Sequence, residues 1–143
     1  MGQQRHCKDR KIEERARLLA ELPRVSCVAD IAGLRSDVDG VYSLGLTNEM
    51  LAALAERVPG LRILASDGNS RVSDAGLDVL RRFVQLEWLD LEWSAVSDAG
   101  LPLIAKVGSL NWVDVGGSER VTAAGVARLR AARPDLEVEP QDF

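Results

Sequence analysis

The sequence repeats itself, and this repetition constrains the possible fold more than any other feature. One recurring element is a frame of apolar residues with the spacing L-x-x-L-x-L, found at Leu86–Leu91, Leu110–Val115, Leu61–Ser66 and, in weaker form, Val41–Leu46. A second element, with the pattern V-[ST]-x-A-G-[LV], follows three of these frames, at Val72–Leu77, Val96–Leu101 and Val121–Val126. A fixed period of this kind indicates one structural unit used several times.

The length of the period narrows the choice of unit. The frames that begin at Leu61, Leu86, Leu110 and Leu136 are 25, 24 and 26 residues apart. The step from Val41 to Leu61 is 20 residues, so we interpret the first unit as shorter, passing from its strand into Thr47–Leu51 without an intervening loop. A period of about 20–29 residues with this frame is typical of leucine-rich repeats.

Over residues 41–138 the chain therefore resembles a short leucine-rich repeat protein. Its V-[ST]-D-A-G-L block resembles the ribonuclease-inhibitor-like, or cysteine-containing, subtype of F-box adaptors. The Cys or Asn usual after the strand in that subtype is replaced here by Asp67, Glu92 and Gly116. The resemblance implies an α/β fold, namely a short right-handed horseshoe-shaped solenoid of about four repeats with a parallel sheet on its concave face. It says little about function, because one fold serves many functions.

The residues of one unit support the same interpretation. In a strand, Leu89 and Leu91 point to one side while Trp88 and Asp90 point to the other. Later in each unit, a Ser or Thr stands where a helix N-cap is expected, and an acid follows in the first turn; these residues are Ser73, Ser97, Thr122, Asp74 and Asp98. Apolar residues then recur at helical spacing, as in Leu77, Leu80 and Val84, in Leu101, Ile104 and Val107, and in Val126 and Leu129. Each unit is predicted to be strand, loop and helix, and stacking of units supplies the core.

The N-terminal part differs from the repeats. Residues 1–24 carry seven Lys or Arg against four Asp or Glu, whereas the rest carries eleven against eighteen. We predict that residues 1–40 hold a basic tail, a capping helix near Lys11–Leu22 and a degenerate first unit over 24–40, followed by a repeat domain at 41–143. The apolar side of the capping helix would be Ile12, Leu18, Leu19 and Leu22. Repeat proteins need such caps with a polar outer face.

Composition predicts a cytoplasmic protein. The N-terminus shows no apolar signal segment, and no apolar run approaches the roughly 18 residues that a membrane span needs. Cys7 and Cys27 are too few for a disulfide framework.

The predicted site lies on the strand face. Across the units we align one row of side chains as Ser43, Ile63, Trp88, Trp112 and Val138, and a second row as Gly45, Ala65, Asp90 and Asp114. Parallel strands lie about 4.8 Å apart, so Trp88 and Trp112 should be neighbours. We expect both to be exposed and Trp93 to close one side. Exposed aromatic residues are typical of protein interfaces, and the acids would favour a basic partner.

Other interpretations of this face remain open. It could form a homodimer interface, or the N-terminal tail could cover part of it. Nucleic acid is disfavoured, because the face is acidic and the arginines at 81, 82, 128, 130 and 133 fall on helices as solvated charge. Catalysis is disfavoured, because the single histidine, His6, lies in the tail. Asp90 and Asp114 could bind a cation, but we expect neither a metal nor a cofactor.

The sequence thus predicts a non-catalytic protein-binding module. Its expected partner-binding residues are Ile63, Trp88, Asp90, Trp93, Trp112 and Asp114. It would act as an adaptor or assembly subunit, or alternatively as an inhibitor or immunity-type protein that blocks an enzyme; a metal-dependent enzyme is the weakest alternative.

Overall fold

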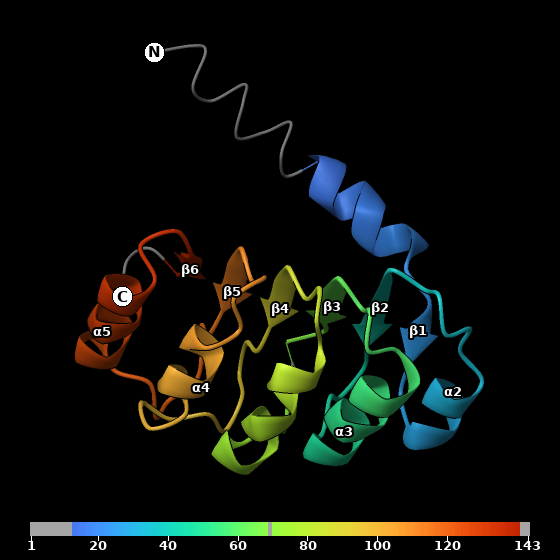
Figure 1. Ribbon diagram of the computed structural model, residues 1–143, viewed down its shortest axis with the longest axis horizontal. Helices are drawn as coiled ribbons and strands as arrows, with labels where there is room; N and C mark the ends of the chain where they lie inside the picture. Colours follow the sequence, from blue (N-terminus) through green and yellow to red (C-terminus); the bar gives the residue numbers. More distant parts are fainter. Residues whose placement is uncertain (1–12, 69, 141–143) are drawn as a thin grey trace.

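The computed structural model describes residues 13–68 and 70–140, which form an α/β fold around one parallel sheet (Figure 1). Its six strands lie in chain order: β1 (Arg24–Val25), β2 (Gly40–Ser43), β3 (Ile63–Ser66), β4 (Trp88–Asp90), β5 (Trp112–Asp114) and β6 (Glu137–Glu139). The intervening helices are α2 (Val28–Ala32), α3 (Asn48–Arg57), η1 (Asp74–Arg82), α4 (Leu101–Ala105) and α5 (Ala123–Ala132). The predicted α/β class and parallel sheet are confirmed.

The core lies between the sheet and these helices, which occupy one side of it in Figure 1. Strand residues Leu64, Leu89 and Val113 are fully buried there, together with helix residues such as Leu54 and Ile104. Because each strand pairs with the next one along the chain, no unit buries its apolar residues alone. No helix in the described ranges has both the length and the apolar character needed to cross a membrane.

The strand register corrects the predicted length of the first unit. Val41 pairs with Leu64, not with Leu61, and the next steps pair Leu64 with Leu89, Leu89 with Val113 and Val113 with Val138. Val41 is therefore the second apolar residue of its frame, and it is fully buried, whereas Leu44 is exposed. The prediction of a 20-residue unit was wrong because the weak frame at Val41 was aligned three residues too late.

The two predicted rows of side chains change accordingly. The first row is Gly40, Ile63, Trp88, Trp112 and Glu137, and the second continues from Tyr42 through Ala65 to the aspartates. Ser43 and Val138 do not belong to the first row, because Ser43 pairs with Ser66 and Val138 is buried opposite Val113. Gly45 likewise lies beyond the second row, after the end of β2.

The N-terminal segment contains the predicted helix, although its position differs from that of a cap. Residues 13–21 are helical, and we call them the N-terminal helix. In Figure 1 this helix lies on the opposite side of the sheet from α3 and α4. It reaches β4 and β5 through Arg15, so it crosses the strand face and does not cover the end of the sheet. The basic tail, Ile12 and His6 lie outside the described residues.

Helical geometry also differs from the prediction in the second repeat. Residues Asp74–Arg82 form a 3₁₀ helix, in which side chains repeat every three residues. The buried set is consequently Leu77, Leu80 and Phe83, while Val84 is 69% exposed. The predicted core position of Val84 was wrong because an α-helical period was assumed.

A ladder of polar contacts connects successive units at the helix starts. The side chain of Asn48 bonds to the N–H and hydroxyl of Ser73, with distances of 3.0 and 2.9 Å. The carboxylates of Asp74 and Asp98 accept the same pair of bonds, from Ser97 and Thr122 respectively. Of the three predicted N-caps, Thr122 accepts a bond from the N–H of Gly125 and Ser97 accepts one from the N–H of Ala99, whereas Ser73 makes no side-chain capping bond. The acids of the block therefore staple one unit to the next.

This ladder explains the glycine of the repeated block. A Cβ atom at Gly76, Gly100 or Gly125 would lie 2.1–2.2 Å from the side-chain oxygen of Asn48, Asp74 or Asp98. No side chain fits there unless the staple breaks. The block thus combines a Ser or Thr that donates, a Gly that leaves room, and an Asp that accepts from the following unit.

Two arginines that were predicted to be solvated instead donate hydrogen bonds to backbone carbonyl oxygens. Arg133 donates to the carbonyl oxygens of Ala105, Val107 and Leu110, at 2.9–3.0 Å, and its side chain is 13% exposed. Arg130 donates to the carbonyl oxygens of Val138 and Pro140. Both hold the last units together, because carbonyls at helix and strand ends otherwise lack donors.

We predict that Gly125→Ala has opposite effects on stability in two backgrounds. In the native chain it should lower the free energy of unfolding, because the new methyl group displaces Asp98 from Thr122. In an Asp98→Ala background it should raise that free energy, by up to about 1 kcal/mol, because alanine favours the helix. Urea denaturation of the four proteins measures both effects. A change of the same sign in both backgrounds would show that the Asp98–Thr122 contact is not the reason for glycine at position 125.

Candidate functional site

The strand face of β4 and β5 carries two tryptophans in direct contact. Trp88 and Trp112 are register partners on neighbouring strands. Their ring centroids are 4.5 Å apart and the rings are tilted by 44°, a separation and tilt favourable for an aromatic pair. Ile63 precedes Trp88 in the same row and is half-buried. The predicted neighbourhood of Ile63, Trp88 and Trp112 is therefore present.

A cation lies on this aromatic pair. The guanidinium carbon of Arg15 is 4.2 Å from the ring centroid of Trp88 and 4.1 Å from that of Trp112. Both distances are well inside the roughly 6 Å range of a cation–π interaction. The N-terminal helix that carries Arg15 is positioned by Leu22, whose side chain packs where Gly40 has no Cβ atom. Gly40, which has no side chain, thus makes room for the N-terminal helix.

The expected exposure of both tryptophans is corrected by these contacts. Trp112 is only 8% exposed and Trp88 is half-buried. They bury each other, and Arg15 covers both rings. The N-terminal helix, which was predicted to cap the end of the repeats, covers part of the face through Arg15. The indole N–H of Trp88 is buried and has no hydrogen-bond partner among the described residues, an unusual state for a buried donor.

A row of carboxylates runs beside the tryptophans. Asp90 pairs with Asp114 and Asp114 with Glu139 across β4, β5 and β6. Asp90 is 8% exposed. Burial raises the pKa of Asp90 to about 7, and the charges of Glu92 and Asp114 add to this effect. Backbone N–H donors of Glu92 and Ser66 oppose it. Asp90 is thus half-protonated near neutral pH.

The carboxyls of Asp114 and Glu92 are also shifted. Burial raises the pKa of each, and the charge of Arg15 lowers both. A hydrogen bond between the two side chains raises the pKa of Glu92 and lowers that of Asp114. Arg15 is therefore close enough to interact with these acids as well as with the rings. The sequence analysis did not include Glu92 or Arg15 among the expected binding residues.

Trp93 is the exposed tryptophan of the group, with 64% of its surface accessible. It has a φ of +54°, and the residues at the same point of the other units are Gly45, Gly68 and Gly117, all with positive φ. Its ring lies against Gly117, where a Cβ atom would approach within 2.3 Å. A bulky residue in left-handed backbone is strained, and such strain tends to persist at functional sites. Stability alone favours glycine at this position.

The loops after the strands are packed by serines that sequence reasoning did not single out. Ser70, Ser94 and Ser118 recur 24 residues apart and are all buried. The hydroxyls of Ser94 and Ser118 are 3.0 Å apart, and each of Ser70 and Ser94 accepts a bond from the N–H two residues later. The buried polar residue of each loop thus lies two or three residues after the position at which the subtype usually has Cys or Asn. The fixed 24-residue spacing of the three serines was the sequence signal that could have identified them.

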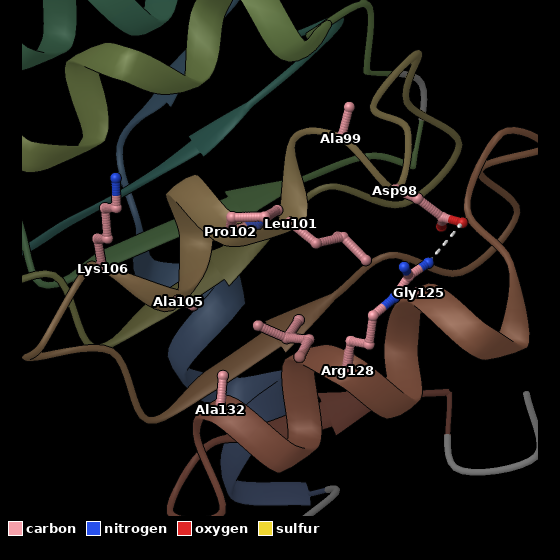
Figure 2. Close-up of a pocket in the computed structure, with 10 residues that line it drawn as sticks. Asp98, Ala99, Leu101, Pro102, Ala105, Lys106, Gly125, Arg128 and Ala132 are labelled. Atoms are coloured by element: carbon pink, nitrogen blue, oxygen red, sulfur yellow. Dashed lines mark ion pairs between the residues drawn. The ribbon is translucent and has the colours of Figure 1, made fainter.

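A second surface feature lies on the helix side of the molecule. A groove of about 620 Å³ runs between α4 and α5 (Figure 2). Its lining is mainly aliphatic, from Leu101, Pro102, Ala105, Leu129 and Ala132. Figure 2 shows the ion pair of Asp98 and Arg128 at one end. The groove has no counterpart in the sequence predictions, because it depends on how two helices pack.

Comparison with known protein families and with curated proteins finds no match for the chain. Among the described residues, no group of three or more His, Cys, Asp or Glu side chains is arranged to hold a metal ion. The site consists of an aromatic pair, a guanidinium and a row of carboxyls.

We predict that Asp90→Asn stabilises the protein above neutral pH. The folded-state pKa of Asp90 lies above the ordinary value of 3.8, so protonation favours folding, and stability decreases as pH rises from about 4 through 7. Asparagine does not ionise, so the variant should not lose stability in this way, and its side-chain oxygen still accepts from the N–H groups of Glu92 and Ser66. At pH 8 the variant should gain about 1–3 kcal/mol.

Urea denaturation at pH 5 and pH 8 tests this expectation, with the exposed Asp78→Asn as control. The gain should be smaller at pH 5. A variant less stable than the native protein at pH 8 would mean that the Asp90 charge stabilises the fold.

We predict that Trp93→Gly does not destabilise the fold and raises the free energy of unfolding by up to about 1 kcal/mol, because glycine adopts positive φ without strain. Thermal denaturation, with Trp93→Ala as control for loss of the ring, measures the effect. Alanine should be less stable than glycine. A large loss of stability in both variants would show that the ring itself supports the fold.

Proposed function

We propose that the chain is a short leucine-rich repeat solenoid and a non-catalytic, cytoplasmic protein-binding module that uses the strand face. The observation that carries the proposal is Trp93. It is 64% exposed and occupies a backbone position that is glycine in three other units, at Gly45, Gly68 and Gly117. A strained, exposed aromatic residue just after β4, the strand that carries Trp88, is better explained by contact with a partner than by folding.

The solenoid part of the proposal is supported by the period and the stacking. Register steps of 23, 25, 24 and 25 residues connect Val41, Leu64, Leu89, Val113 and Val138. The strands follow chain order, and the helices that connect them lie on one side. Both properties are expected of repeats in which each unit contacts only its neighbours.

The partner is proposed to be a protein with a basic surface, and Ile63, Trp88, Asp90, Trp93, Trp112 and Asp114 are proposed to contribute to its binding. The guanidinium of Arg15 already lies on the aromatic pair, and its charge lowers the pKa of Asp114 and Glu92. Aromatic anchors with charged neighbours are typical of binding hot spots. A phosphate backbone would be repelled by the same carboxyls.

An adaptor role is favoured over an inhibitor role by the groove between α4 and α5. An adaptor needs two surfaces, and the apolar groove is lined by α4 and α5, which lie on the opposite side of the sheet from the N-terminal helix. An inhibitor that blocks one enzyme needs the strand face alone. The homodimer alternative predicts that the face binds a second copy of the chain.

We predict that Trp88→Ala/Trp112→Ala reduces capture of the partner from cell lysate by at least about tenfold, because hot-spot aromatics contribute about 2 kcal/mol or more each. The measurement is quantitative mass spectrometry of an affinity pull-down. Val84→Ala, which removes a 69% exposed apolar side chain elsewhere, is the matched control. Circular dichroism establishes that all three proteins are folded.

The variant Ala132→Trp, which fills the groove between α4 and α5, distinguishes an adaptor from an inhibitor. An adaptor should lose a second, different protein while keeping the partner of the strand face. Equal capture by the native protein and the double tryptophan variant would reject the strand face as the binding surface. Capture of the chain itself, with a dimer in sedimentation equilibrium, would favour the homodimer.

A further inference from the structure

We infer that Trp88 and Trp112, with Glu92 and Asp114, form a guanidinium-binding site that Arg15 fills in cis and that an arginine of the protein partner fills in its place. The N-terminal helix is then a displaceable cover over the binding face. This inference rests on the proposed protein-binding function and specifies the side chain that is recognised.

The geometry of the site matches a guanidinium. Arg15 is almost equidistant from the two rings, at 4.2 and 4.1 Å, so its planar group lies over both. A guanidinium is planar and weakly hydrated and stacks on aromatic faces better than an ammonium does. The carboxyls of Glu92 and Asp114 supply compensating charge, since Arg15 lowers the pKa of both. The rings and the acids come from two units whose alignment the sheet determines.

The cover is held by few contacts. Within the N-terminal helix only Arg15 and Leu19 are even half-buried, and the apolar Leu18 is 40% exposed. Leu22, just after the helix, packs against Gly40 and connects it to the first strands. Short helices are marginal in water without packing. Apart from the rings that Arg15 covers, release of the helix therefore exposes little buried surface.

The cover and the ligand compete for one place. A side chain tethered on the same chain acts at an effective concentration in the millimolar range, so it excludes weak, non-specific arginines. A partner gains entry when the exposed Trp93 and the rest of the face add binding energy. The exposed Trp93 and the covered pair thus have different roles: first contact and selective recognition.

The test uses a defined probe, the peptide acetyl-Gly-Ser-Arg-Ser-Gly-amide, titrated into ¹⁵N-labelled full-length protein. The indole N–H signals of Trp88 and Trp112 report on the site, and the backbone N–H signal of Val84, which is exposed after the helix η1, serves as reference. In Arg15→Ala the peptide should shift both signals at a concentration at least tenfold lower than in the native protein. Arg17→Ala, which removes an exposed arginine from the same helix, should behave as the native protein does.

The lysine counterpart of the peptide should bind the opened site at least several-fold more weakly. Equal shifts with both peptides would overturn guanidinium recognition. Equal shifts in native protein, Arg15→Ala and Arg17→Ala, or no shift in any, would overturn the cover. Circular dichroism of each variant separates these outcomes from misfolding.

The pull-down distinguishes this inference from the proposed function. Arg15→Ala should capture more partner than the native protein, and the arginine peptide should compete with that partner. If neither occurs while the double tryptophan variant still loses the partner, the inference fails and the protein-binding function stands. If the double tryptophan variant captures the partner normally, the proposed function fails whatever the peptide does.

Discussion

The structure depends on the contact between one unit and the next. Strands pair in parallel in chain order, and at the opposite side Asn48, Asp74 and Asp98 bond to the Ser or Thr that begins the following helix. The glycine of the repeated block exists because this bond leaves no space for a side chain. Apolar burial opposes a one-residue slip of a strand, because such a slip would turn its apolar side chains away from the core. The directional bonds add to this constraint, so every strand residue has a definite neighbour.

Because each strand residue has a definite neighbour, residues from different units come together in one site. Trp88 and Trp112 are 24 residues apart in the chain, yet their rings are in contact because their strands are in register. The same register brings Asp90 beside Asp114, and their mutual charge adds to burial in raising the pKa of Asp90 to about 7. The proposed binding face and the proposed recognition of a guanidinium both follow from this alignment. Trp93 extends the face at some cost in backbone strain.

The candidate site could be predicted in part. The strong frames at Leu86 and Leu110 placed both tryptophans and both aspartates correctly on neighbouring strands. The weak frame at Val41 was misaligned, because its apolar residues fit two registers and only pairing with Leu64 distinguishes them. The role of Arg15 could not be predicted, since nothing in a local pattern states where a helix will lie. The small Gly40 was the only signal.

Local patterns were sufficient for the unit and for its repetition. The period, the alternation in each strand and the Ser/Thr–Asp–Gly block are short-range properties, so they can be read from the amino acids directly. Exposure, pKa and the cover on the tryptophans were decided by tertiary structure, because each depends on residues distant in the chain. Trp112 is buried by Trp88 and Arg15, and Asp90 is half-protonated because of burial and neighbouring acids.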